Sequence, residues 1–312
     1  MKKPLVILTG PTAVGKTELS IMLAKAVGGE IISADSMQVY KLMDIGSAKI
    51  SKTEMGGVKH YLIDELMPDE EFNIVRFKQM ASAALEEIYA DGHIPIVTGG
   101  TGFYIQALLY DVDFTANETD NFYRKELERL AGEKGNDYLH DMLKEADAAA
   151  ARAIHPNNVK RVIRALEYNK LTGKKISEHN EAESKKESPY NFAYIVLNRR
   201  REELYRRIEK RVDIMLGEGL VDEVKHLKEL GYTRNMVSMQ GLGYKEMLDY
   251  LNGEITLEEA VYILKRDTRH FAKRQLTWFR REREVCWLDV DGRTAEKSLE
   301  EILQILKQKN II

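Results

Sequence analysis

Gly10-Pro11-Thr12-Ala13-Val14-Gly15-Lys16-Thr17 is the stretch that decides the fold of this 312-residue chain. It matches the phosphate-loop pattern G-x-x-x-x-G-K-[ST] at every fixed position. Residues 5–8 form a short apolar run before it, and residues 16–27 repeat apolar side chains at helical spacing after it. The pattern requires a strand, a glycine-rich loop and a helix in this order, and that context disfavours an incidental glycine turn. We therefore predict a phosphate-binding loop at residues 10–17.

The chemistry of such a loop comes from its backbone and from two side chains. Backbone NH groups converge on phosphate oxygens at the start of a helix, whose dipole also favours anions. Lys16 adds a point charge, and the Thr17 hydroxyl is a candidate ligand for Mg²⁺ bound to phosphate. The pattern indicates a phosphate or diphosphate and does not name ATP. An NTPase often carries a metal-binding acid at a strand end, but residues 94–98 run into glycines and the acid follows another strand, as Asp35.

Short apolar runs alternate with helical patterns along the chain. Helical spacing continues at residues 77–90, and the strand-like runs are residues 5–8, 31–32, 94–98, 194–197 and 285–288. Strands that alternate with helices favour an α/β fold with a parallel sheet covered on both faces.

Residues 116–193 differ from the rest of the chain because they contain helical patterns and no strand-like run. The segment at residues 177–189 (SEHNEAESKKESP) is polar and has the composition of a flexible connector. We predict a P-loop core formed by residues 1–115 and 194–312, with an all-helical insertion domain at 116–193.

Composition narrows the class of protein. A hydrophobic content of 44% supports a folded core, and the single cysteine, Cys286, excludes a disulfide framework. The apolar run at the N-terminus is too short for a signal peptide or a membrane span, so we expect a soluble, cytoplasmic protein. The net charge of −3 means that a polyanionic partner needs a local basic patch.

Such a patch is predicted at residues 265–283, which hold eight Lys or Arg against Asp267 and Glu282. On a helix, six of these bases share one side and the apolar residues occupy the other. A solvated helix face normally interleaves charges of both signs, so this pattern favours nucleic acid. Leu276 interrupts the basic side without an explanation. The basic side would present Lys265, Arg266, Arg269, Lys273, Arg280 and Arg283.

Six further segments resemble tRNA dimethylallyltransferases (tRNA isopentenyltransferases) of the bacterial type. They follow the phosphate loop in the order of that family and are DSMQVYKLMDIGSAK (35–49), HYLID (60–64), TGGTGFYIQALL (98–109), KRVIRALE (160–167), QGLGYKE (240–246) and KRQLTWFRRE (273–282). The resemblance implies a prenyltransferase that moves a dimethylallyl group from its diphosphate to N6 of the adenosine 3′ to the anticodon. Val14, Ser47 and Tyr61 depart from the usual residues of the family, and no zinc-finger pattern of the eukaryotic type follows.

The resemblance assigns roles that the residues also support chemically. A carboxylate beside a phosphate loop suits a base for the N6 proton, and Asp35 is our candidate; a cap of the following turn is the alternative. Thr101 resembles a threonine that contacts the target nucleotide, with a helix N-cap as the alternative. Lys16 completes the catalytic set. Arg211, in preference to Arg207, is expected to join loop residues 10–17 around the diphosphate, unless both belong to a solvated charged face.

The expected partners are the tRNA anticodon stem-loop, dimethylallyl diphosphate and Mg²⁺, with no membrane or protein partner and a monomeric chain. The target base should be flipped out of its stack into the site. The basic cluster near residue 160 is expected at the tRNA, with an ordinary helix surface as the alternative. The expected tRNA-binding residues are Asp35, Ser36, Met37, Gln38, Thr101, Arg124, Lys160, Arg161, Val162, Ile163, Arg164, Gln240, Gly241, Leu242, Gly243, Tyr244, Lys245, Lys273, Arg274, Gln275, Leu276, Thr277, Trp278, Phe279 and Arg280.

Three other functions would each explain only some of these residues. A small-molecule kinase explains the phosphate loop but not the basic helix. A non-catalytic RNA-binding protein explains the basic helix but leaves the loop and Asp35 without a role. An enzyme that prenylates free adenine nucleotides needs neither the basic helix nor the insertion.

Overall fold

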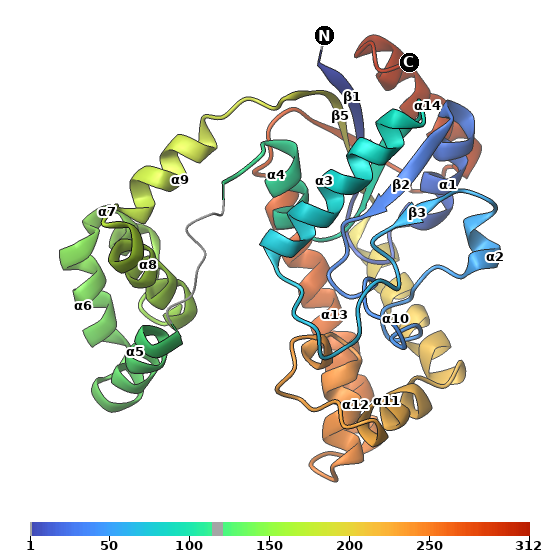
Figure 1. Ribbon diagram of the computed structural model, residues 1–312. Coiled ribbons are helices and arrows are strands. Elements are labelled where there is room, and N and C mark those ends of the chain that lie inside the picture. The colour runs from blue at the N-terminus through green and yellow to red at the C-terminus, as the bar shows by residue number, and fades with distance from the viewer. Residues whose placement is uncertain (1, 114–120) are drawn as a thin grey trace. The chain divides into compact units, whose positions relative to one another are not determined.

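The strand before the phosphate loop is β1 (Lys3–Thr9), an inner strand of a six-stranded parallel sheet (Figure 1). In this computed structural model, which describes residues 2–113 and 121–312, β1 pairs with β4 on one side and β5 on the other. The strand order is β3-β2-β4-β1-β5-β6. The other strands are β2 (Gly29–Ser33), β3 (His60–Tyr61), β4 (Ile94–Gly99), β5 (Tyr190–Asn198) and β6 (Val285–Asp289).

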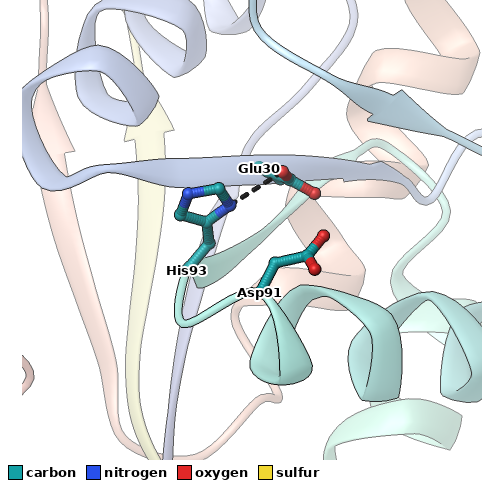
Figure 2. Close-up of side chains that lie close together, drawn as sticks. All are labelled: Glu30, Asp91 and His93. Carbon is teal, nitrogen blue, oxygen red and sulfur yellow. Dashed lines mark hydrogen bonds and ion pairs between the residues drawn. The ribbon is translucent and has the colours of Figure 1, made fainter.

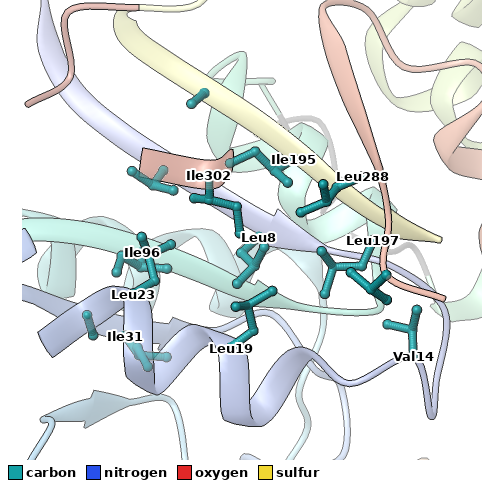
Figure 3. Close-up of a cluster of buried hydrophobic side chains, with 14 of the residues drawn as sticks. Leu8, Val14, Leu19, Leu23, Ile31, Ile96, Ile195, Leu197, Leu288 and Ile302 are labelled. Carbon is teal, nitrogen blue, oxygen red and sulfur yellow. The ribbon is translucent and has the colours of Figure 1, made fainter. Parts of the chain in front are cut away.

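Both faces of the sheet are covered, as the alternation of side chains along β1 requires. Val6 and Leu8 belong to a buried cluster shared with α1 (Lys16–Val27) and α14 (Ala295–Gln308) (Figure 3). Leu5 and Ile7 are equally buried but lie outside that cluster, on the opposite face. There α3 (Ile74–Ala90) contacts β2 and β4. The α/β fold with a parallel sheet is confirmed.

The remaining helices of the sheet-containing unit follow the strands or extend beyond them. Strand β5 leads into α10 (Arg201–Gly217), and α13 (Leu257–Phe279) packs against α10 and α12. The others are α2 (Lys52–Met55), α4 (Gly102–Leu109), α11 (Leu220–Glu229), the 3₁₀ helix η2 (Ser238–Gln240) and α12 (Tyr244–Leu251).

The chain divides into two compact units, one formed by Met1–Leu108 with Pro189–Ile312 and the other by Leu109–Ser188. These divisions fall several residues before the expected boundaries at 116 and 193. The second unit has its own apolar core, which includes Leu127, Leu143 and Leu166. Its helices are α5 (Asn121–Lys134), α6 (Asn136–Ala146), α7 (Ala148–Ala153), α8 (Val159–Thr172) and α9 (Ile176–Ser184).

One expectation for this unit is wrong. The polar segment at 177–189 was expected to be a flexible connector, but its first half belongs to α9. Tertiary contacts explain the difference, because the buried carboxylate of Asp147 accepts hydrogen bonds from the Ser177 backbone NH (2.9 Å) and hydroxyl (2.7 Å). Polar composition alone does not reveal this anchor.

Among the described residues, no helix has both the length and the apolar character needed to cross a membrane.

Candidate active site

The phosphate loop begins at the carboxyl end of β1, and two of its positions favour glycine. A Cβ on Gly10 would lie 2.6 Å from the Leu197 carbonyl oxygen. Gly15, which caps α1, has a φ of 111°, a conformation that costs side-chain-bearing residues energy. Val14 is completely buried in the core cluster, so this unusual residue anchors the loop. The sequence therefore forms a loop that is fixed at its middle and at both ends.

Lys16 folds back over this loop. Its Nζ donates to the carbonyl oxygens of Gly10 (3.0 Å) and Pro11 (2.9 Å). Burial, followed by the neighbouring Arg211 cation, lowers the pKa of Lys16 to about 7, and the Asp35 carboxylate opposes this shift. A partly desolvated ammonium group beside carbonyls and another cation favours the arrival of an anion.

Three arginines contact the loop from the other side. Arg207 Nε donates to the Ala13 carbonyl (2.8 Å), and Arg211 Nη1 lies 3.4 Å from Thr12 Oγ1. Burial lowers the pKa of Arg211, while Asp35 opposes that effect. Arg199 belongs to none of the sequence motifs, yet its Nε donates to the Val14 carbonyl (2.9 Å). The sequence does place Arg199 directly after strand β5. Because β5 is parallel to β1, both strands end at the same edge of the sheet, where the phosphate loop begins.

Asp35 follows β2 and faces the same cavity as Lys16 and Arg211. One carboxylate oxygen accepts a hydrogen bond from the Met37 backbone NH at 2.9 Å. Asp35 therefore caps the following turn, which was the alternative interpretation, and it also lines the cavity, so its role as a base stays a prediction.

Gln275 ties the phosphate loop to the loop after β4. Its Oε1 accepts from the Thr12 NH and its Nε2 donates to the Gly100 carbonyl, both at 2.9 Å. A Cβ on Gly100 would lie 2.1 Å from Gln275 Nε2, so a side chain there would displace the Gln275 amide. Thr101 precedes the first residue of α4 and adjoins this loop without lining the cavity. Gln275 is 6% exposed, which makes it a bridge inside the protein.

These groups enclose a cavity of about 500 Å³. One part of its lining is polar and carries Lys16, Thr17, Asp35, Arg207 and Arg211. Aliphatic side chains, including Ile31, Ala48, Ile50 and Ile63, complete the wall. A phosphate-bearing molecule with a small apolar group fits this mixture of surfaces.

The helix expected to carry the basic patch is α13, and the structure corrects its extent and its faces. The helix ends at Phe279, so Arg280 and Arg283 lie beyond it and the helical projection does not apply to them. Lys265 pairs with Asp213 (2.5 Å) and Arg269 with Glu209 (2.7 Å), both on α10. That part of the expected basic side faces a neighbouring helix.

A second hollow, of about 390 Å³, lies along the later part of α13. Lys273 and Arg274 are exposed there. Leu276, which had no explanation in the sequence, packs against the core cluster. Phe279 is completely buried, and Trp278 lies against Gly102 and Phe103 at the start of α4. The hollow is lined by His270, Lys273, Arg274, Thr277, Trp278 and Arg281.

Comparisons with known proteins identify the family. The IPP transferase family model matches residues 38–282. A tRNA dimethylallyltransferase of Lachnoclostridium phytofermentans is 64% identical over 311 residues, which cover 99% of both chains. This chain belongs to the tRNA dimethylallyltransferase family.

Solved structures of family members agree with the fold. The tRNA isopentenylpyrophosphate transferase of Bacillus halodurans has a TM-score of 0.75 and 47% identity, with 99% of this chain and 98% of that chain covered. A eukaryotic dimethylallyltransferase described as acting on tRNA has a TM-score of 0.84 and 30% identity, with 98% of this chain and 80% of that chain covered. The chain is therefore an enzyme of the prenyltransferase class.

The two family segments at 35–38 and 240–245 lie together. The Met37 side chain fills the space beside Gly241, where a Cβ would lie 2.5 Å from Met37 Cε. Gln240 is exposed, whereas Tyr244 is completely buried. Ser36, Gln38, Leu242 and Lys245 are partly exposed, and Gly243 is buried.

The family segment in the helical unit has two kinds of residue. Lys160 and Arg161 are exposed on α8, whereas Val162 and Ile163 are buried in the core of that unit. Arg124 makes two hydrogen bonds (2.9 and 2.7 Å) to the completely buried carboxylate of Glu167. Burial lowers the pKa of Arg164, which is partly exposed. The side chains of Val162, Ile163, Tyr244, Gln275 and Phe279 are buried and support these segments from inside, and Gln275 also lines the cavity. Their contact with tRNA stays a prediction.

The described residues contain one cluster of potential metal ligands, formed by Glu30, Asp91 and His93 (Figure 2). It lies at the start of β2, whereas Asp35 follows the end of that strand. The Glu30 carboxylate already accepts from Tyr61 Oη at 2.7 Å and contacts His93 Nδ1 at 2.8 Å. This cluster is separate from the cavity at the phosphate loop.

Proposed function

We propose that this enzyme transfers a dimethylallyl group from dimethylallyl diphosphate to N6 of the adenosine on the 3′ side of the anticodon in tRNA, acting as a cytoplasmic monomer. The observation that carries the proposal is that one cavity combines a phosphate loop, the Asp35 carboxylate and an aliphatic wall. A kinase needs the first of these features and has no use for the last.

The reaction breaks the bond between the allylic carbon and its diphosphate oxygen and forms a bond from that carbon to N6. Negative charge grows on the leaving diphosphate. Lys16, Arg211 and the loop NH groups supply positive charge and donors where that charge develops. Lys16 donates two of its three ammonium hydrogens to backbone carbonyls, which leaves one for an incoming phosphate.

Conjugation of its lone pair with the ring makes N6 a weak nucleophile, and N6 must lose a proton to become neutral once it is bonded to the allylic carbon. Asp35 lines the cavity and uses one oxygen for the Met37 NH, which leaves the carboxylate able to accept that proton. The diphosphate departs with the electron pair of the broken bond.

The polar part of the cavity offers oxygen atoms that suit Mg²⁺ as ligands. Thr17 offers a hydroxyl, and the carboxylates of Asp35 and Glu18 line the same cavity. Mg²⁺ prefers oxygen ligands and is often held by one or two protein groups together with substrate phosphates. Bound there by Thr17 and the diphosphate, it would neutralise charge on the leaving group.

The nucleic acid is proposed to contact the exposed basic side chains. Four of these side chains are exposed and can reach a phosphate backbone. They are Lys273 and Arg274 on α13, and Lys160 and Arg161 on α8. An adenine stacked in an anticodon loop must leave the stack to reach a carboxylate inside a cavity, so base flipping belongs to the proposal.

The test is to incubate the enzyme with labelled dimethylallyl diphosphate and either unmodified tRNA or AMP, and separately with ATP. Mass analysis of the nucleosides should find one added C5 unit on N6 of the adenosine beside the anticodon. A tRNA whose target adenosine is replaced by guanosine is the matched control. Transfer to AMP alone, or phosphoryl transfer from ATP, would contradict the proposal.

A further inference from the structure

One wall of the cavity is a loop between β2 and α2 that includes residues 44–50. Ser47, Ala48 and Ile50 of this loop line the cavity. Ala48 has a φ of 45°, a left-handed conformation that a residue with a side chain adopts only when its surroundings impose it. The contacts that hold this loop therefore control the shape of the wall.

The loop is held from outside by Glu223 of α11. One carboxylate oxygen accepts from the backbone NH groups of Asp44 (2.9 Å) and Ile45 (2.7 Å). The other accepts from the Gly46 NH (3.0 Å) and from Tyr244 Oη (2.9 Å). A carboxylate that accepts from three successive NH groups fixes the path of that backbone through strong, charge-assisted hydrogen bonds.

Tyr244 continues this anchor. Its hydroxyl donates to Glu223 and accepts from the Ser47 NH at 3.1 Å. Its ring lies so close to Gly46 that a Cβ there would be 2.6 Å from the ring carbon Cζ. Burial, followed by the charge of Glu223, raises the pKa of Tyr244 well above its usual value, so the proton stays on the hydroxyl. Four consecutive NH groups, from Asp44 to Ser47, thus end on two side chains.

A second anchor acts inside the loop. Lys49 Nζ contacts the Tyr40 carbonyl oxygen and the carboxylates of Asp44 and Asp64, each at 2.6 Å. In sequence, the wall residues Ser47 and Ala48 lie between residues 44–46, which Glu223 holds, and Lys49. Gln38, which also lines the cavity, donates to the Ala48 carbonyl at 3.3 Å.

We propose that Glu223 is a positioning residue that fixes this wall, so that Ala48 and Ile50 limit the length of the prenyl chain that the cavity accepts. The inference rests on the proposed function, since it takes the aliphatic wall to be the surface that meets the allyl group. Glu223 touches neither substrate and acts through the backbone of residues 44–46.

The test compares Glu223→Gln with the parent enzyme. Glutamine keeps the side-chain volume but replaces one acceptor oxygen with an NH₂ group, which cannot accept from the loop. Affinity is measured by calorimetry for unreactive thiolodiphosphate analogues of the C5 and C10 allylic substrates. We expect the preference for C5 over C10 to fall at least tenfold, and hydrogen exchange of the amides at 44–47 to become at least tenfold faster.

Two further variants keep the test decisive. Glu229→Gln changes an exposed residue on the same helix and should match the parent enzyme in both measurements. Tyr244→Phe removes one donor to Glu223 and should produce a change of the same kind but about threefold, which serves if Glu223→Gln does not fold.

Each result decides the proposal. If a folded Glu223→Gln variant weakens both analogues equally and lowers the Tm, its role is only structural and the proposal is overturned. An unchanged C5 to C10 ratio despite faster amide exchange also overturns it, because the wall would then not measure chain length. Failure of the proposed function is seen separately, as the absence of prenylated tRNA with the parent enzyme.

Discussion

Two sets of cations in the same unit have opposite surroundings. Lys16 and Arg211 are partly exposed at the phosphate loop, where their hydrogen bonds go to backbone carbonyls and the Thr12 hydroxyl. Lys265 and Arg269 on α13 are each 25% exposed and pair with carboxylates of α10. Burial lowers the pKa values of the first set.

From this difference we infer which cations are available to bind a ligand. A cation that is already paired contributes to the packing of two helices, and a new phosphate must compete with its partner. A partly desolvated cation whose hydrogen bonds go to neutral acceptors is instead stabilised by an incoming anion. The number of positive charges in a segment does not distinguish these cases.

The strongest test of the comparison removes the carboxylate nearest to the loop cations. Asp35→Asn should lower kcat by about 10²–10⁴, because the amide cannot accept the N6 proton. Single-turnover kinetics with saturating tRNA and dimethylallyl diphosphate measure this loss. Affinity for tRNA should stay near the parental value, and a parental rate would leave Asp35 with only its cap on the Met37 NH.

The next test removes a loop cation. Lys16→Ala should lower kcat by about 10²–10³, because the leaving diphosphate loses a stabilising charge. tRNA binding, measured by filter retention, serves as the control and should change little. Unchanged turnover at saturating substrate would remove Lys16 from the catalytic set.

A smaller effect follows from the lowered pKa of Lys16. With a pKa of about 7 in the free protein, this lysine is neutral above pH 7 and must take up a proton when a diphosphate binds. The Kd for inorganic diphosphate should therefore rise, by up to about tenfold per pH unit, as the pH increases above 7. Calorimetry across this range measures it, and Lys16→Met provides the baseline for the ionisation of the ligand itself.

The smallest effect separates two parts of α13. Lys273→Ala with Arg274→Ala should reduce the slope of log K for tRNA against log salt by about 0.7–0.9 for each lost phosphate contact. Arg269→Ala should leave that slope unchanged and lower the Tm slightly, because an exposed ion pair contributes about 0.2–1 kcal/mol. If Arg269→Ala reduced the salt slope as much as the Lys273→Ala, Arg274→Ala variant, the ion pair with Glu209 would not prevent Arg269 from contacting the RNA.

Local sequence predicted the elements of the site well. The helix expected at residues 16–27 is α1, and the five expected strands are all present. The short strand β3 was not expected. These are features of neighbouring residues, namely apolar periodicity and glycines at a fixed spacing. The same patterns could not show that Arg199 contacts the loop, since the two segments are 185 residues apart.

The sequence by itself determined that a phosphate loop follows a buried strand, that the sheet is parallel and that Asp35 stands at a strand end beside the loop. Only the tertiary structure decided which charges are available. Folding placed Glu209 beside Arg269, buried Gln275 between Thr12 and Gly100, and brought Glu223 to the backbone of residues 44–46. The physical reason is range: helix and strand patterns arise between near neighbours, whereas the pairing and burial of a charge depend on residues far apart in the chain.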